Sequence, residues 1–315
     1  MEPNVFCMNS YFWLHSFYSD LLPGDGETLI GTGYRPSGGG KGVNQAFAAS
    51  YQGCHVEVLG RMGKDEPGRI FAEECSSCGV GTKYIYYDPE HYTGCGCILR
   101  DNHGGNAIVI VPGVQDYLTE DDFSRAEEYV RTCAIGSFQL EVNVDSILYA
   151  IRRTAELGVS TFLDPAPAVP LSKEIFPYLD YIKPNEHEAG ILTGIPVTDY
   201  ASAEKAGRWL MDQGVRQAAI ITLGSQGSVA VTKDGCEVYP CPTVTVKDPT
   251  CAGDSFAGAF VAAIAKGACF REAMLQATEL AALTVAVQGS MYNCFHTCSP
   301  LLKEIQTAYR AQIRQ

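Results

Sequence analysis

Residues 133–163 read CAIGSFQLEVNVDSILYAIRRTAELGVSTFL. The short apolar run Cys133–Gly136 predicts a strand, and Val144–Leu157 predicts a helix that Asn143 is suited to cap. Ser160–Leu163 then predicts a second strand. Two strands joined by a helix of this length form a βαβ unit, and the strands of such a unit run parallel in one sheet.

The same alternation continues toward the C-terminus. Tyr181–Lys183 and Ala219–Leu223 predict further strands, and Ala201–Gln213 predicts the helix between them. We therefore expect an α/β fold with a mainly parallel sheet that helices cover on both faces. The chain contains no internal repeat, low-complexity tract or long linker, so we predict that residues 1–315 form a single domain.

Two separated segments interrupt this pattern. Residues from about 11 to 36 are rich in Tyr, Phe, Pro and Gly, and residues from about 84 to 111 predict a hairpin around the turn Asp101–Gly105. We predict that both segments pair into one small β-sheet, which forms a lid beside the body. The aromatic residues of the first segment favour a homodimer through this lid, and packing of the lid against the body is the alternative reason for them.

The charge balance excludes several classes of partner. Lys and Arg total 23 against 36 Asp and Glu, so the formal net charge is −13. A chain this acidic offers no electrostatic surface to nucleic acid or to an anionic membrane, and it must hold an anionic substrate by backbone amides, a helix N-terminus or a metal. No apolar run approaches the roughly 18 residues of a membrane span, and the N-terminus lacks the basic region of a secretory signal. We expect a cytoplasmic protein with reduced cysteines.

The cysteine spacing invites comparison with zinc sites. Cys75 and Cys78 form a C-x-x-C pair, and Cys95 and Cys97 form a C-x-C pair. The first pair ends a predicted helical segment, Ile70–Cys78, and no second C-x-x-C follows. Because the ligand set of a structural zinc site is incomplete, we do not predict one.

Residues 37–49, SGGGKGVNQAFAA, place a glycine cluster around Lys41 directly before a predicted helix. Glycines let the backbone approach a ligand closely, and we expect Asn44 to face outward from the first helical turn. The stretch is not a P-loop, because Arg35 and Gly42 stand where that motif needs Gly and Ser or Thr. Lys41 and Asn44 could bind phosphate or sugar hydroxyls, and a tight turn without a ligand is the alternative.

Residues 248–259, DPTCAGDSFAGA, follow a predicted strand at Val244–Lys247 and begin a helix that extends to Ala265. The free amides of residues 251–254, with the helix dipole behind them, could form an anion hole for a phosphoryl group in transfer. Asp254 could accept the proton of an attacking hydroxyl, or it could simply cap the helix.

Two further strand ends carry polar groups. Asn185, Glu186 and Glu188 open a predicted helix, and their oxygens suit a hydrated Mg²⁺, although Glu in a first turn also complements the helix dipole. Residues 222–227, TLGSQG, form a glycine-framed turn after a strand, which is a candidate nucleotide contact.

In their order and identity, these motifs resemble the ribokinase branch of the PfkB carbohydrate kinases. The resemblance runs over nearly the whole chain. It rests on seven motifs: GGKGVNQ at 39–45, QLE at 139–141, DPAPA at 164–168, KPNEHE at 183–188, LTGI at 192–195, ITLGSQG at 221–227 and AGDSF at 252–256. It implies a ribokinase-like three-layer α/β/α body with a small β-sheet lid. It also implies an ATP-dependent kinase that uses Mg²⁺ and, as activating monovalent cation, K⁺.

The resemblance further implies roles for individual residues. Asp254 is similar to the base that deprotonates the primary hydroxyl of the sugar, beside the anion-hole residues Cys251, Ala252 and Gly253. The implied substrate-binding residues are Gly40, Lys41, Gly42, Asn44, Glu141 and Asp254. The implied nucleotide-binding residues are Asn185, Glu188, Thr222, Leu223, Gly224, Ser225, Gly227, Gly253 and Thr278. The implied monovalent cation site comprises Asp248, Thr250, Thr284, Val287, Gly289 and Asn293.

Two positions depart from the family pattern. Leu14 stands where relatives of ribokinase usually have an Asp that holds sugar hydroxyls, and a leucine side chain accepts no hydrogen bond. Hydrogen bonds to a charged group contribute about 1.5–3 kcal/mol each, so Leu14 weakens the case for ribose but not for phosphoryl transfer. Asp20 could substitute only if the segment is re-routed, because its spacing is wrong. Cys251 stands where the family usually has Gly or Ala, and only its backbone amide is needed.

Three functions follow from these motifs. The first is phosphorylation of D-ribose to D-ribose 5-phosphate. The second is the same chemistry on a nucleoside, pseudouridine or a hexose derivative, with Phe12 and Trp13 stacking on the acceptor. The third is a non-catalytic, sugar-sensing relative, which is disfavoured because a sensor needs no proton acceptor such as Asp254.

Overall fold

The computed structural model describes residues 3–103, 105–287 and 299–313. A nine-stranded sheet forms its centre, in the order β13-β12-β11-β10-β9-β8-β1-β4-β5. Its strands are β1 (Asn4–Met8), β4 (His55–Gly63), β5 (Val80–Asp88), β8 (Cys133–Phe138), β9 (Ser160–Leu163), β10 (Tyr181–Ile182), β11 (Ala218–Thr222), β12 (Ser228–Thr232) and β13 (Gly235–Tyr239). Neighbours from β5 to β11 run parallel, and β12 pairs antiparallel with both β11 and β13. The expected mainly parallel sheet is confirmed.

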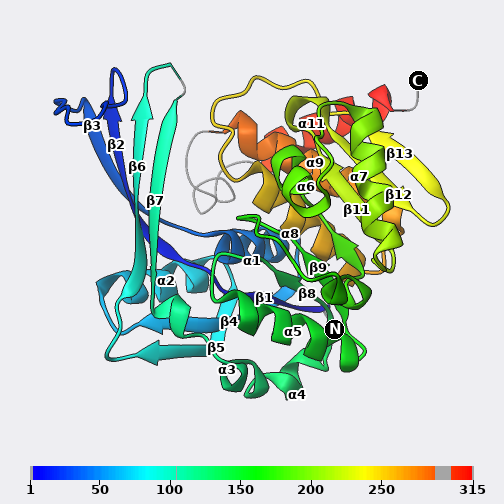
Figure 1. Ribbon diagram of the computed structural model, residues 1–315, viewed down its shortest axis with the longest axis horizontal. Helices are drawn as coiled ribbons and strands as arrows, with labels where there is room; N and C mark the ends of the chain where they lie inside the picture. The colour runs from blue at the N-terminus through cyan, green and yellow to red at the C-terminus, as the bar shows by residue number, and fades with distance from the viewer. Residues whose placement is uncertain (1–2, 104, 288–298, 314–315) are drawn as a thin grey trace.

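Helices cover both faces of this sheet (Figure 1). They are α1 (Lys41–Tyr51), α2 (Glu66–Ser77), α3 (Glu120–Ser124), α4 (Glu127–Val130), α5 (Val144–Glu156), α6 (Glu186–Thr193), α7 (Tyr200–Asp212), α8 (Ala252–Ala265), α9 (Phe270–Ala286) and α11 (Ser299–Gln312). Short 3-10 helices are η1 (Val114–Tyr117), η2 (Lys173–Tyr178) and η3 (Gly224–Gln226). Because side chains alternate along a strand, Val5 and Cys7 of β1 pack in a core with α1, α8 and α9, whereas Phe6 and Met8 pack in a second core with α5 and α7. The result is three layers, α/β/α.

A second, four-stranded sheet is the predicted lid. Its order is β3-β2-β6-β7, with β2 at Phe12–Ser19, β3 at Gly33–Gly39, β6 at Thr93–Asp101 and β7 at Asn106–Gly113. The parallel pairing of β2 with β6 joins the two lid segments, and β6 and β7 form the expected hairpin. In Figure 1 this sheet projects from the body at the upper left.

The lid boundaries need correction. Residues 84–88 lie in β5 of the central sheet, where Leu59 of β4 pairs with Tyr84, so the second lid segment begins at Thr93. The first segment continues to Gly39 and leads directly into α1.

Two predicted elements also differ. Val244–Lys247 forms no strand, and the Lys247 amide instead donates to the carbonyl of Val285 at the end of α9. The helix expected at Ile70–Cys78 begins earlier, at Glu66, because the Asp65 side chain accepts the Gly68 N–H and caps it.

Helix α5 was predicted well. It begins at Val144, and the Asn143 side chain accepts the Ser146 N–H at 3.0 Å. Among the described residues, no helix combines the length and the apolar character needed to cross a membrane.

Candidate active site

The polar residues from the sequence motifs gather at the carboxyl ends of the central parallel strands. Glu141 follows β8, Asp164 follows β9, Lys183 and Asn185 follow β10, and Thr222 ends β11. Open α/β sheets bind ligands at this edge, since the loops that leave the strands converge there. The fold therefore brings motifs from distant parts of the sequence to one place.

Asp254 lies buried in the first turn of α8. Its Oδ2 accepts a hydrogen bond from Asn44 Nδ2 at 2.8 Å, and its Oδ1 accepts one from Lys41 Nζ at 3.3 Å. Both donors come from α1, so the glycine cluster and the α8 motif form one site. A cationic donor and an amide donor therefore hold this carboxylate in place.

The prediction that Asn44 faces outward is wrong. Asn44 is only 7% exposed, because its side chain turns toward α8. Its Nδ2 also lies 3.4 Å from Cys251 Sγ. Asn44 therefore links the start of α1 to the start of α8.

Lys41 is surrounded by carboxylates. Its Nζ lies 3.3 Å from Asp254 Oδ1 and 3.5 Å from Asp164 Oδ2. Burial alone would lower the pKa of Lys41, but the charges of these two carboxylates and of two nearby glutamates raise the pKa well above its usual value. The ammonium thus stays charged in the site.

Glu141 ties the beginning of α1 to the end of β1. Its Oε2 accepts hydrogen bonds from Ser10 Oγ and from the Lys41 amide, each at 2.7 Å, and Ser10 Oγ accepts the Gly42 amide at 2.7 Å. Burial raises the pKa of Glu141, although the Lys41 charge opposes the shift. Gly40 has φ 151°, and a Cβ there would lie 2.3 Å from the Ser10 carbonyl oxygen, so the close approach requires glycine.

Helix α8 begins with amides that lack helical acceptors. The first helical bond runs from the Ser255 amide to the Cys251 carbonyl, so the amides of Ala252, Gly253 and Asp254 have no acceptor within the helix. Cys251 itself has φ 65°, in the left-handed region. Thr250 next to it contacts Arg100 of the lid, with Nη2 3.4 Å from Oγ1. This is the geometry that an anion hole at residues 251–254 would need, and the hole stays a prediction.

Asn185 and Glu188 form a capping box at the start of α6. Glu188 Oε2 accepts the Asn185 amide at 2.8 Å, and Asn185 Oδ1 accepts the Glu188 amide at 2.9 Å. Burial raises the pKa of Glu188, and the charge of Asp164 raises it further.

The predicted nucleotide turn lies beside this helix start. Thr222 bridges to Asn185, and a Cβ on Gly224 would lie 3.8 Å from Glu186 Oε1. Leu223 is buried in the core, so only its backbone is available to a ligand. The hydroxyl of Thr278 donates to Met274 O within α9, and the described contacts do not bring Thr278 to the other nucleotide residues.

Part of the predicted cation site is brought together. The amides of Lys247 and Asp248 donate to Val285 O at 2.7 and 3.2 Å, which docks the loop containing Asp248 and Thr250 on the α9 end that carries Thr284 and Val287. Gly289 and Asn293 lie outside the described residues. Within the described residues, no group of three or more His, Cys, Asp or Glu side chains is arranged to hold a metal ion.

Some residues of the site had no role in the sequence-based predictions. Gln45 Oε1 accepts hydrogen bonds from Ser137 Oγ and Gln139 Nε2, each at 2.6 Å, and its Nε2 donates to Asp164 Oδ2 at 3.0 Å. Lys183 is paired with the same carboxylate. Gln139, Asp164 and Lys183 lie in the seven motifs just after strands, and Ser10 follows β1, so their positions at strand ends were the available signal. Gln45 lies inside α1, in the first motif.

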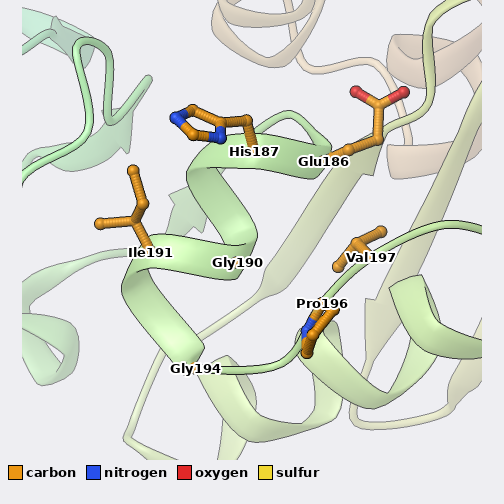
Figure 2. Close-up of a pocket in the computed structure, with 7 residues that line it drawn as sticks. All are labelled: Glu186, His187, Gly190, Ile191, Gly194, Pro196 and Val197. Carbon is orange, nitrogen blue, oxygen red and sulfur yellow. The ribbon is translucent and has the colours of Figure 1, made fainter.

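A surface groove of about 490 Å³ lies on α6, lined by Glu186, His187, Gly190, Ile191, Gly194, Pro196 and Val197. Figure 2 shows Glu186 and His187 at the start of the helix, with Pro196 and Val197 beyond its end. Glu188 of the same helix does not line this groove, and neither do the residues around Asp254. The groove therefore shares only Glu186 with the strand-end site.

Comparison with known proteins agrees with this geometry. The model of the pfkB family carbohydrate kinases matches residues 15–298. A deoxyribokinase of Salmonella typhimurium is 33% identical over 278 residues, which cover 87% of this chain and 89% of that protein. A ribokinase of Haemophilus influenzae is 34% identical over 265 residues, with 84% and 86% covered.

Solved structures show the same fold. The Arabidopsis thaliana ribokinase complexed with ribose and ATP superposes with a TM-score of 0.84 at 28% identity, covering 96% of this chain and 99% of that one. The Methanocaldococcus jannaschii nucleoside kinase, at 20% identity and a TM-score of 0.77, shares the fold. The chain belongs to the pfkB family of carbohydrate kinases and is an ATP-dependent sugar kinase of the ribokinase and deoxyribokinase type.

Proposed function

We propose that this kinase transfers the γ-phosphoryl group of ATP to the primary hydroxyl of a pentose, with D-ribose as the first candidate and D-ribose 5-phosphate as its product. The observation that carries the proposal is the buried Asp254 carboxylate, held by Lys41 and Asn44 at the start of α8. The ribokinase and deoxyribokinase relatives support a pentose as acceptor.

In the proposed reaction, Asp254 takes the proton of the sugar hydroxyl while the hydroxyl oxygen attacks the γ-phosphorus. The bond from the γ-phosphorus to the bridging oxygen breaks, and its electron pair leaves with ADP. The amides of residues 251–254 bind the oxygens of the transferred group. Lys41, Asn44 and Glu141 hold the sugar hydroxyls, so that only the primary hydroxyl reaches the phosphorus.

The Mg²⁺ ion that accompanies ATP would neutralise part of the negative charge of the phosphates. Its hydration shell fits Asn185 and Glu188, because the capping bond uses Oε2 of Glu188 and leaves Oε1 without a hydrogen bond to another described residue. We propose that K⁺ would be held by the oxygen donors of Asp248, Thr250, Thr284 and Val287. The hydrogen bonds from the Lys247 and Asp248 amides to Val285 O support this proposal. Turnover measured with K⁺ replaced by Na⁺ tests the proposed K⁺ site. Equal turnover rates with the two ions would contradict a K⁺-specific site.

The test of the proposed base is Asp254→Asn. We expect turnover to fall by about a thousandfold or more while binding of the sugar and of ATP stays within a few-fold, because the amide keeps the shape but accepts no proton. Near-native turnover in this variant would show that Asp254 is not the base. Calorimetric titration with each ligand separates binding from chemistry.

A second acceptor, 2-deoxy-D-ribose, is favoured by Leu14. This side chain lies on β2 against two glycines, where a Cβ on Gly39 or on Gly96 would lie 2.9 or 2.8 Å from its methyl groups. An apolar group beside the glycine cluster suits a sugar that lacks one hydroxyl. A panel of D-ribose, 2-deoxy-D-ribose, nucleosides, pseudouridine and hexoses, with ADP release as readout, ranks the acceptors. Tight sugar binding without ADP release across the panel would instead indicate a sensing protein.

The remaining predictions concern the oligomeric state and the cellular location of the enzyme. We propose a homodimer formed through the lid, because apolar side chains such as Val109 and Tyr34 are exposed there. A cytoplasmic location stays a prediction from the cysteine content and the N-terminal sequence.

A further inference from the structure

Tyr11 lies at the junction between the body and the lid. It is fully buried, in the connection from β1 to β2. The side chain of Gln115 holds both backbone groups of Tyr11, since its Oε1 accepts the Tyr11 amide at 3.3 Å and its Nε2 donates to the Tyr11 carbonyl. Gln115 lies in η1, directly after the last lid strand. The first and the last chain segments that join the lid to the body are therefore fixed to each other at Tyr11.

The side chain of Tyr11 extends to α2, which Figure 1 shows at the base of the lid. Its hydroxyl donates to Glu74 Oε2 at 3.1 Å, and its ring packs edge-on against Phe71 of the same helix, with the ring centroids 5.0 Å apart. Burial raises the pKa of Tyr11, and the charge of Glu74 raises it further. The phenol therefore stays protonated and remains a donor to the carboxylate.

The glycine cluster before α1 packs directly on this pair. A Cβ on Gly38 would lie 2.2 Å from the Tyr11 hydroxyl oxygen and 2.6 Å from Glu74 Oε2. A Cβ on Gly40 would lie 3.0 Å from Tyr11 Cα. Because these distances leave no room for a side chain, the backbone of residues 38–40 needs glycine to lie against Tyr11 at two places. The cluster thus serves a contact between chain segments, in addition to any approach to a ligand.

This contact bears on the sugar site because Lys41 directly follows the cluster. The Lys41 amide donates to Glu141 Oε2 at 2.7 Å, and the Lys41 ammonium group lies 3.3 Å from Asp254 Oδ1. Residues 38–40 set the point at which the chain enters α1, so a shift of their backbone would move both groups of Lys41. Small displacements of positioning groups can cost an enzyme much of its efficiency.

We infer that Tyr11 and Glu74 are positioning residues for the acceptor sugar, which fix residues 38–40 and, through them, the groups of Gly40, Lys41 and Asn44 that hold the sugar. This inference rests on the proposed function and adds to it a buried support that acts through the glycine cluster. Binding groups that are held by their own hydrogen-bonded support are in place before the ligand arrives. Sugar affinity should therefore depend on the hydrogen bond between Tyr11 and Glu74, whereas ATP affinity should not.

The experiment compares three substitutions at this pair with one elsewhere. Tyr11→Phe removes the hydroxyl and keeps the ring, Glu74→Ala removes the acceptor, and Glu74→Gln keeps an acceptor oxygen. The matched control is Tyr239→Phe, which removes a hydroxyl that donates to Glu237 Oε2 at 2.6 Å on β13, at the far edge of the central sheet. Steady-state kinetics with the best acceptor of the sugar panel give kcat and the KM for sugar and for ATP. Calorimetric titration gives the sugar affinity, and urea denaturation gives the stability.

We expect Tyr11→Phe and Glu74→Ala each to raise the KM and the dissociation constant of the sugar about tenfold, because a hydrogen bond to a charged group is worth about that factor or more. Both kcat and the KM for ATP should stay within about twofold, since a loss of binding that is equal in the ground state and the transition state changes the sugar KM alone. Glu74→Gln should restore the native sugar KM. The double variant Tyr11→Phe with Glu74→Ala should be no worse than either single variant, because both remove the same hydrogen bond. The control should leave the sugar KM unchanged.

A native sugar KM in Tyr11→Phe would overturn the inference, even if the stability of the variant fell. A parallel rise of the KM for sugar and for ATP would also overturn it, since that pattern indicates a general structural role. If the unaltered protein phosphorylated no sugar of the panel, the proposed function itself would fail. That result differs from an active kinase whose sugar KM is indifferent to Tyr11 and Glu74.

Discussion

At the scale of single residues, Cys251 adopts a backbone conformation that side chains avoid. Its φ of 65° lies in the left-handed region, which costs a non-glycine residue about 1–2 kcal/mol. The residue precedes α8 directly, so this turn sets the direction of the amides that follow. The conformation therefore fixes the start of α8, where the anion hole is proposed.

We predict that Cys251→Gly keeps kcat within about twofold and raises the free energy of unfolding by up to about 1 kcal/mol, because glycine adopts this conformation without strain. Cys251→Val should lower both kcat and the free energy of unfolding, since a β-branched side chain resists a positive φ. Steady-state kinetics and urea denaturation provide the measurements. A large loss of kcat in the glycine variant would instead implicate the thiol in the reaction.

Glu141 should make the stability of the folded protein depend on pH. Burial raises its pKa in the folded state above the usual value of 4.5, so the folded protein binds more protons than the unfolded chain above pH 4.5. Stability from this group therefore falls as pH rises from 4.5 through the folded-state pKa. Each unit of pKa difference is about 1.4 kcal/mol.

The matching variant is Glu141→Gln, which keeps an acceptor for Ser10 and for the Lys41 amide. We predict that the stability of the native protein relative to this variant declines between pH 4.5 and neutrality. The variant should bind the sugar more weakly than the native protein does over this whole pH range. Urea midpoints over this pH range provide the check. A relative stability that rises with pH would show that ionised Glu141 is stabilised by its site.

At the scale of elements, strand β2 carries Leu14, the residue that we propose sets the acceptor preference. Leu14 pairs with Ser37 of β3 and Gly96 of β6, and it shares a face of the lid with Phe12 and Ser16, which are buried toward the body. The side chain thus lies on the same lid face as two buried residues, next to the glycine cluster at Gly39.

We predict that Leu14→Asp raises the ratio of kcat/KM for D-ribose over 2-deoxy-D-ribose by about tenfold or more, because one charged hydrogen bond to a hydroxyl contributes about 1.5–3 kcal/mol. Leu14→Ala is the control, since it removes the apolar group without adding an acceptor. Competition assays with both sugars measure the ratio. If Asp and Ala variants showed the same ratio, the side chain would not contact the acceptor.

Elements with local signals were predictable from the sequence, and those defined by their partners were not. Ser160–Leu163 and the Asn143 cap agree with the structure, because apolar runs and capping residues act within a few positions. Tyr84–Asp88 is rich in aromatic and β-branched residues, which suits a strand in either sheet, and only its pairing with β4 assigns it to the central one.

The same division applies to the candidate site. The motifs identified Asp254, Lys41 and Asn44 individually, and only the resemblance to the PfkB kinases implied that they belong to one substrate site. The orientation of Asn44 toward Asp254 and the pairing of Lys183 with Asp164 depend on contacts between segments far apart in the chain. Such pairings are properties of the packed structure, so no local pattern reveals them.

At the scale of the whole molecule, the lid has apolar groups on both faces. Phe17 pairs with Tyr34 across β2 and β3, and Val109 pairs with Cys97 across β6 and β7; all lie on the face opposite to Leu14. Phe17, Tyr34 and Val109 are 42%, 55% and 67% exposed. We call this the outer lid face. A projecting sheet with an exposed apolar face is suited to pair with a second copy about a twofold axis.

We predict that the protein sediments as a dimer at micromolar concentration and that Val109→Lys converts it to a monomer, because a lysine at the centre of an apolar interface must be desolvated. Val238→Lys is the control: this residue is 42% exposed on β13, at the far edge of the central sheet. Each copy carries a charge of −13, so the dimer should tighten as salt rises to about 150 mM, where the screening length is about 8 Å. Sedimentation velocity at several concentrations measures both effects. A native monomer, or a dimer that persists in the Val109 variant, would exclude the outer lid face as the interface.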